Sequence, residues 1–441
     1  MFCICLYPAV RYVKRRESGV PAVPILCGAY AIQFALPVFF GDRTLWLIGG
    51  WKEVSYESLV FALVVANGAI AAFLAISYSS IAKRLVSGLP ALDLRLNRTK
   101  ALAYCLITAL LSLFAPQVFA LLPLDAQTQY GAIAKLLQNQ VLVAIGILAW
   151  LTNGNGALWL RVLYYMVVAS AAIAGAATGF LEAAVAPVGI MFVCQWLYRR
   201  RINVSLAMAL FGAALLLNPV KGEFRETVWY SEVSGAEVSK VAKAMLWIET
   251  GVGYWSDVLG GRVRGHDAVA QLLSRTSMID ILALVCETTP DSAPYLTGET
   301  YSYFAYSLIP RAFWPEKPVA SANKTLAVEY GLTTPEGAER STFGVSLIGE
   351  GYANFGWLGS VVVMALLAIV LLVLQRVFAT PRSGPGGYAL FLSFFIFFLN
   401  GLGSSLEILF GNLLQNVVVS YLLLYWVIDH GAKSGGTAPR R

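Results

Sequence analysis

The side chains best suited to chemistry are concentrated between residues 220 and 355. This stretch holds 16 of the 25 Asp and Glu residues and six arginines. Besides Arg225 these are Arg262, Arg264, Arg275, Arg311 and Arg340, several of them at predicted turns. Guanidinium groups bind phosphate oxygens in pairs and stay charged at any working pH. For each arginine the alternative is an ordinary ion pair with a nearby acid. At Arg311 the surrounding sequence favours anion binding.

Arg311 lies in the proline-rich segment Pro310-Arg-Ala-Phe-Trp-Pro-Glu-Lys-Pro318. Prolines at this density exclude the interiors of helices and sheets and predict fixed turns. The segment therefore presents Arg311 and Lys317 on a stiff backbone, with Trp314 between them. Trp314 and the preceding Tyr301 have rings that can stack on sugars, although aromatic residues are common at membrane interfaces for other reasons.

Two residues of this region are candidates for a general base. Glu350 and Asn354 lie in Gly349-Glu350-Gly-Tyr-Ala-Asn354-Phe-Gly356, whose glycines permit close backbone approach. We expect both side chains at the membrane surface. His266 precedes a helical pattern that runs from about Asp267 to Glu287. Glu350 is the preferred base because it lies beside the membrane, and His266 is the second candidate.

The composition indicates that a membrane protein positions these residues. Of the 441 residues 58% are hydrophobic and only 13% are charged, whereas a soluble domain has about 25% charged residues. One crossing of a bilayer core takes roughly 20 apolar residues. Ten stretches approach that length: 21–40, 57–77, 101–122, 132–152, 157–178, 181–198, 203–219, 356–377, 387–402 and 412–429. The apolar start MFCICLYPAV is too short to cross, and is either a short segment or the end of an eleventh helix.

The charge distribution predicts the orientation of these spans. Residues 220–355 carry a net charge of −5 and the rest of the chain +12. If the spans alternate, the basic clusters of the short loops all fall on one side: 14–16, 83–100, 199–201, 376–382 and 433–441. The positive-inside rule assigns that side to the cytoplasm. We predict an all-α polytopic protein of a bacterial inner membrane, with both termini cytoplasmic.

The predicted chain has three parts. Residues 1–219 form an N-terminal bundle of seven spans, residues 220–355 a large periplasmic loop with short helices, and residues 356–441 three further spans and a cytoplasmic tail. Within the loop, residues 237–248 have apolar side chains at helical spacing. This helix either lies on the membrane surface near anionic lipid or, as we prefer, packs on the rest of the loop.

Two features of the spans themselves are notable. The sequence Gly401-Leu-Gly-Ser-Ser-Leu-Glu407 interrupts the last apolar run, as a tight turn or a re-entrant segment does, and Glu182 lies between two spans. A carboxylate near hydrocarbon is costly and usually faces a cavity or a partner. For both features the alternative is a simple position at interface depth.

Several classes of function are disfavoured. The basic residues lie in short loops beside spans, which argues against nucleic-acid binding. Only Cys286 of the six cysteines falls in the long loop, so we expect no structural disulfide there. There is no CxxC or Cys/His spacing, and the only histidines are His266 and His430. We therefore expect no metal and no cofactor.

The sequence also resembles a known family. Pro310-Arg311-x-x-Trp314-Pro315-x-Lys317-Pro318, followed by Gly349-Glu350 and Asn354-Phe-Gly356 before a span, is similar to bacterial O-antigen and exopolysaccharide polymerases of the Wzy type. The run from Thr289 to Tyr301 is similar too. The resemblance is sharp over about residues 275–360, and elsewhere covers only the pattern of spans with one large periplasmic loop.

The resemblance implies a GT-C-like membrane glycosyltransferase without a nucleotide sugar. The donor would be a growing glycan on undecaprenyl pyrophosphate and the acceptor a lipid-linked repeat unit, with a flippase and a chain-length regulator as possible partners. Positive charge would stabilise the departing pyrophosphate, so arginines would replace a metal. The implied catalytic residues are Arg275, Arg311 and Glu350. The implied substrate-binding residues are Arg264, His266, Tyr301, Trp314, Lys317, Arg340 and Asn354.

Two other classes are alternatives. An O-antigen ligase shares this plan but is expected to carry a periplasmic histidine near the later arginines, and residues 276–355 contain no histidine. A lipid-linked oligosaccharide flippase would have short loops and a polar cavity among its spans. This chain instead concentrates its charge in one loop, so we prefer the polymerase.

Overall fold

The computed structural model describes residues 1–15, 19–40, 44–47, 50–153, 157–230, 240–264, 276–317, 321–340 and 343–429. This part is helical apart from one hairpin, in which β1 (Thr44–Leu47) pairs antiparallel with β2 (Gly50–Glu53). The helices of the first half are α1 (Phe2–Lys14), α2 (Ala22–Tyr30), the π-helical η1 (Ala31–Ala35), α3 (Pro37–Phe40), α4 (Tyr56–Tyr78), α5 (Ser80–Ser87), α6 (Arg98–Ala120), α7 (Leu124–Leu151), α8 (Leu158–Ala176), α9 (Leu181–Arg199) and α10 (Val204–Leu217). Those of the second half are α11 (Lys221–Tyr230), α12 (Lys240–Leu259), α14 (Ile279–Thr288), α15 (Glu299–Ser307), α16 (Ala322–Glu329), α17 (Pro335–Arg340), α18 (Ser346–Phe378), the 3-10 turn η3 (Pro381–Ser383), α19 (Gly384–Asn400) and α20 (Leu406–Tyr425).

Nine helical segments in the described ranges are long and apolar enough to cross a membrane. They correspond to nine of the ten predicted spans, consistent with an all-helical polytopic membrane protein. The remaining stretch, expected over 203–219, forms α10, which has only 14 residues. A helix of that length covers about 21 Å, against a hydrocarbon core of about 30 Å. One predicted span is therefore shorter than expected.

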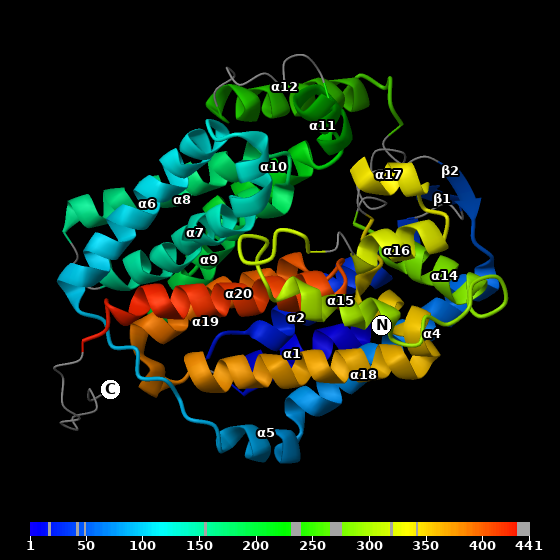
Figure 1. The fold of residues 1–441 in the computed structure, drawn as a ribbon, viewed down its shortest axis with the longest axis horizontal. Helices are drawn as coiled ribbons and strands as arrows, with labels where there is room; N and C mark the ends of the chain where they lie inside the picture. The colour runs from blue at the N-terminus through cyan, green and yellow to red at the C-terminus, as the bar shows by residue number, and fades with distance from the viewer. Residues whose placement is uncertain are drawn as a thin grey trace.

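The long helices lie side by side. In Figure 1, α18, α19 and α20 run together along the long axis, while α6, α7, α8 and α9 form a second group. α4 packs against α18, and α7 packs against α19, which joins the two groups. Small residues allow the closest contacts, since a methyl group at Gly175 of α8 would overlap the backbone of Ala183 in α9.

The two ends of the bundle are built differently. At one end the hairpin lies near α14, α16 and α17 (Figure 1), and the backbone N–H of Ser55 donates to Glu287 Oε2 at 3.1 Å. We call this the hairpin end. At the other end, the Arg376 guanidinium donates to the carbonyls of Leu89 and Ser87, each at 3.0 Å. We call this the Arg376 end. Residues 276–350 therefore gather where the link between the first two spans also lies.

Two helices predicted within residues 220–290 begin and end at other residues in the structure than the sequence indicated. The helix expected over 237–248 is α12, which packs on α8, α10 and α11, and its Trp247 ring stacks on Phe224 at 4.9 Å. α12 therefore packs on α11 of the predicted loop and on the spans α8 and α10, while the apolar side chains of Val241, Met245 and Ile248 stay exposed. The helix expected to reach Glu287 begins only at Ile279, because the backbone N–H of Met278 donates to Gln33 O at 2.9 Å. Its expected start, Asp267, is outside the described residues.

Glu350 and Asn354 are expected at the membrane surface, and the structure adds that both side chains are buried within the protein. α18 begins at Ser346, ten residues before the predicted span, and both side chains are fully buried in its first turns. The helix is interrupted at Phe355 and Gly356, where Gly356 has φ of +63°. The glycines explain the burial, since a methyl group at Gly351 would lie 2.8 Å from the backbone of Gly359.

Candidate functional site

Glu350 is the centre of the candidate site. Its Oε2 accepts the backbone N–H of Leu406, the first residue of α20, at 2.6 Å. This contact places a carboxylate at a helix N-terminus, where the helix dipole favours negative charge. Its Oε1 is buried and has no hydrogen-bond partner among the described residues. A buried polar atom normally has a partner. The Thr300 side chain acts on this carboxylate, and the unpaired oxygen is a candidate to accept a proton.

Asn354 links the helical turn that carries Glu350 to the start of α15. Its Nδ2 donates to the Thr300 hydroxyl at 2.8 Å and to the Glu350 carbonyl at 2.9 Å. Its Oδ1 accepts the backbone N–H of Gly298 at 2.9 Å, where a φ of +97° turns the chain into α15. Asn354 is one turn after Glu350, so both lie on the same face of the helix. Asn354 therefore joins the start of α15 to α18.

A second buried carboxylate, Glu407, lies beside Glu350. It belongs to the first turn of α20, and its Oε2 accepts the backbone N–H of Ala322 at the start of α16, at 2.7 Å. The neighbouring backbone N–H of Ser405 donates to Asn323 Oδ1 at 3.0 Å. The negative charges of Glu350 and Glu407 act on each other. The two carboxylates thus tie α16, α18 and α20 together, and Asn354 adds α15.

The proline-rich segment brings two cations to this junction. Its turns are closed by backbone hydrogen bonds, and Arg311 Nη1 donates to Pro315 O at 3.2 Å. Lys317 Nζ donates to Ile309 O at 3.1 Å. Burial lowers the pKa of Lys317 and the positive charge of Arg311 lowers it further, whereas the charge of Glu407 raises it. The prediction of a turn-rich segment that presents both cations is confirmed.

Two aromatic side chains border the site. Tyr301 lies in the first turn of α15, and its ring centroid is 6.2 Å from that of Phe355. Burial raises the pKa of Tyr301, and the charge of Glu350 raises it further. Trp314 packs edge-on against Tyr306 at 5.9 Å. Tyr301 therefore faces the carboxylate, whereas Trp314 covers the outer side of α15.

The chain was also compared with known families. Residues 90–432 match the family described as “Domain of unknown function (DUF8712)”. The chain belongs to this family. No curated protein and no solved structure matches it. The DUF8712 region begins just before α6 and ends just after α20, so it includes every residue of the site described above and leaves out the first five α-helices.

Four other predicted site residues of the DUF8712 region are not brought into this junction by a described contact. Arg264 is exposed at the end of the stretch that follows α12. Arg340 is the last residue of α17, and its side chain is outside the described part. Arg275 and His266 are outside the described residues altogether. Their predicted roles stay predictions.

Glu407 is the site residue that the sequence did not single out as catalytic or binding. The sequence did show an interruption of the apolar run at residues 401–407. In the structure this interruption is a tight turn between α19 and α20, the first of the two alternatives predicted for it. What the sequence could not show is that this carboxylate reaches the start of α16. Glu182 instead has its own partner, since Lys221 Nζ lies 3.8 Å from its Oε2.

The donor groups of the site do not resemble a metal centre. Among the described residues there is no group of three or more His, Cys, Asp or Glu side chains that could hold a metal ion. What the site does combine is a buried carboxylate oxygen, two cations and a tyrosine at one end of a membrane bundle. That set suits proton transfer beside an anionic leaving group.

Proposed function

We propose that the chain is a membrane glycosyltransferase that joins lipid-pyrophosphate-linked oligosaccharide repeat units on the extracytoplasmic side of the membrane. One observation carries this proposal. The buried Glu350 carboxylate, one oxygen of which makes no hydrogen bond to a described residue, lies beside Glu407, and Glu407 in turn acts on Lys317 of the segment that contains Arg311. The resemblance of residues 275–360 to Wzy-type polymerases supports the same assignment.

In the proposed reaction, a hydroxyl oxygen of the acceptor sugar attacks the anomeric carbon of the donor. The bond from that carbon to the pyrophosphate oxygen breaks, and its electron pair leaves with undecaprenyl pyrophosphate. Arg311 and Lys317 bind the developing negative charge, as cations do at leaving phosphates. Glu350 Oε1 takes the proton of the acceptor hydroxyl and later releases it to water.

The side of the membrane on which the site lies is also part of the proposal. The hydrogen bond between Ser55 and Glu287 supports placing residues 276–345 on the same side as the short link between the first two spans. That side is opposite to the basic clusters at residues 14–16 and 83–100. The positive-inside rule then favours the periplasm for the site and a bacterial inner membrane for the protein.

The experiment is a polymerisation assay with purified protein in lipid nanodiscs. Its substrate is the undecaprenyl-pyrophosphate-linked repeat extracted from the same bacterium after disruption of the gene. Wild-type protein should produce a ladder of longer products. A Glu350→Gln variant keeps an oxygen that can accept the Leu406 N–H, but it lacks the base and should produce no ladder. Arg311→Ala should lose at least tenfold in rate, because a charged contact to phosphate is worth about 1.5–3 kcal/mol.

Glu336→Gln is the matched control, because Glu336 is exposed in the first turn of α17. Its ladder should equal that of the wild type. A full ladder from Glu350→Gln would remove Glu350 from the mechanism. If the disrupted strain accumulates long lipid-linked chains in place of single repeats, the protein is a ligase and the proposal is wrong.

A further inference from the structure

A second set of polar groups lies at the Arg376 end, far along the bundle from Glu350. Here α7 ends, α8 begins and α9 ends. A cavity of about 10 Å³ lies there, and its lining includes Ala149, Thr152, Tyr164, Tyr165, Gln195 and Arg199. This volume holds about one water-sized atom. We call it the Tyr164 niche.

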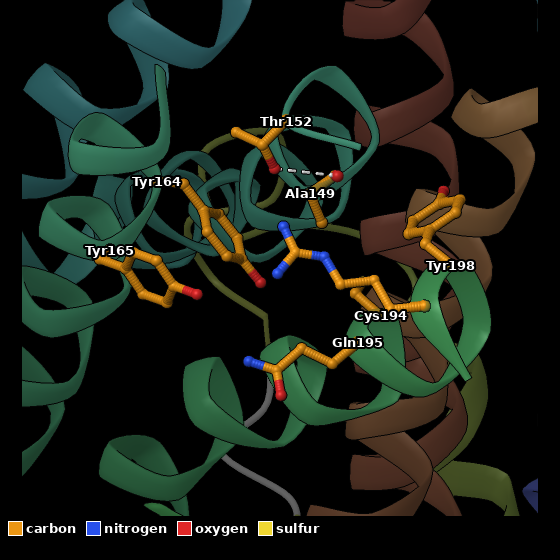
Figure 2. Close-up of a pocket in the computed structure, with 8 residues that line it drawn as sticks. Ala149, Thr152, Tyr164, Tyr165, Cys194, Gln195 and Tyr198 are labelled. Carbon is orange, nitrogen blue, oxygen red and sulfur yellow. Dashed lines mark hydrogen bonds between the residues drawn. The ribbon is translucent and has the colours of Figure 1, made fainter. Parts of the chain in front are cut away.

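The niche contains a donor without an acceptor. The side chain of Tyr164 is only 5% exposed, and its buried hydroxyl makes no hydrogen bond to any residue that the structure describes. Figure 2 shows the hydroxyls of Tyr164 and Tyr165 and the amide of Gln195 around one space between α8 and α9. The Thr152 hydroxyl is already used, since it donates to Ala149 O at 3.0 Å. An unpaired buried hydroxyl is costly, so an acceptor at this point would remove that cost.

The charge around the niche is positive. Arg199 lines it, and its positive charge acts on the Tyr164 hydroxyl. Within the described ranges, Arg199 makes no ion pair, and its side chain is exposed. Arg200 and Arg201 follow directly, and residues 183–222 contain no Asp or Glu. The ligand that suits these groups is an anion with several acceptor oxygens.

We propose that the Tyr164 niche binds a phosphate group, from either an anionic lipid headgroup or free inorganic phosphate. One phosphate oxygen occupies the niche and accepts a hydrogen bond from Tyr164. The remaining oxygens lie outside it, within reach of the Arg199 guanidinium, which binds phosphate oxygens in pairs. The Gln195 amide adds a neutral donor. This site does not depend on the proposed glycosyltransferase activity.

The test measures thermal stabilisation of the full-length protein in detergent. The probes are phosphatidic acid and diacylglycerol with the same acyl chains, which differ only in the phosphate. Phosphatidic acid should raise the unfolding temperature of the wild type, and diacylglycerol should not, because a ligand that binds only the folded protein stabilises it by an amount that grows with the logarithm of its concentration above the Kd. Tyr164→Phe and Arg199→Gln should each need about tenfold more phosphatidic acid for the same rise, as expected for one lost hydrogen bond to a charged group.

Arg201→Gln is the matched control, because it removes a neighbouring arginine that does not line the niche. It should respond as the wild type does. Without ligand, Tyr164→Phe should unfold at the same temperature as the wild type or higher, since it removes an unpaired hydroxyl from the interior. A loss of response in that variant therefore cannot be attributed to misfolding.

Inorganic phosphate separates the two sources of the ligand. If phosphate alone stabilises the wild type but not Tyr164→Phe, the niche takes free phosphate. If phosphatidic acid stabilises the wild type and inorganic phosphate does not, the niche binds a lipid headgroup. Equal stabilisation by diacylglycerol, or an unchanged response of both niche variants, would overturn the proposal.

Discussion

Replacement of Asn354 by alanine is the sharpest test of the junction described above. The amide makes three hydrogen bonds, two as donor and one as acceptor, and it is fully buried. Alanine removes all three bonds and leaves the Gly298 N–H and the Thr300 hydroxyl oxygen without their partner. The first turns of α18 would then lose their attachment to α15.

The size of the effect follows from the number of bonds. Each intramolecular hydrogen bond contributes about 1 kcal/mol net, so the three bonds together contribute about 3 kcal/mol to the free energy of unfolding. An unfolding entropy of about 2.1 cal/mol/K per residue, taken over 441 residues, amounts to about 0.9 kcal/mol/K. Asn354→Ala should therefore lower the unfolding temperature by about 3 °C.

The assay is thermal unfolding of the purified protein in detergent, followed by the loss of the monodisperse peak in size-exclusion chromatography. Asn67→Ala is the control, because the Asn67 amide donates within its own helix, to Leu63 O, and its buried Oδ1 accepts no hydrogen bond from the described part of the chain. That variant should unfold at the wild-type temperature or above. If Asn354→Ala stays within 1 °C of the wild type, the junction is not held as argued.

Three other outcomes follow from particular residues. Gly359→Ala should lower the unfolding temperature, because its methyl group would overlap the carbonyl oxygen of Gly351 and overpacking costs about 1–3 kcal/mol; Gly68→Ala, which meets nothing within 4 Å, should not. Glu407→Gln should move the alkaline limb of the polymerisation pH profile to lower pH, because the Glu407 charge raises the pKa of Lys317; an unshifted limb would refute this coupling. Burial raises the pKa of Asp280, so its ionisation opposes folding as pH rises above the unfolded value of about 4. Asp280→Asn should then unfold at a higher temperature than the wild type at pH 7 and at the same temperature at pH 4, and an equal difference at both pH values would contradict the assignment.

The spans and the turn-rich segment could be predicted because they depend on local properties. Nine of ten apolar stretches form long helices, since a run of apolar residues has one low-energy state in lipid. The prolines of residues 310–318 restrict the backbone whatever surrounds them, and Arg311 and Lys317 hold the turns that they predict.

The burial of Glu350 could not be predicted, because it depends on contacts with distant residues. Its partner is a backbone N–H 56 residues later, and Asn354 likewise bonds to Thr300, 54 residues earlier. The glycines around Glu350 indicated that another backbone comes close, but they did not indicate that Glu350 itself lies in a helix. The same holds for Glu407, whose position after a tight turn gave no sign that it caps α16 through Ala322.

The interruption at Gly356 has a mechanical consequence. α18 consists of two helical segments joined at a kink. The first segment bonds to α15 through Asn354 and to α20 through Glu350, and the longer second segment follows Gly356. At the joint, a methyl group on Gly356 would lie 3.2 Å from the Tyr295 hydroxyl, so only glycine fits both the angle and the space. The short segment that carries Glu350 is thus joined to the long remainder of α18 at a single glycine, whose backbone angles set the direction of one segment relative to the other.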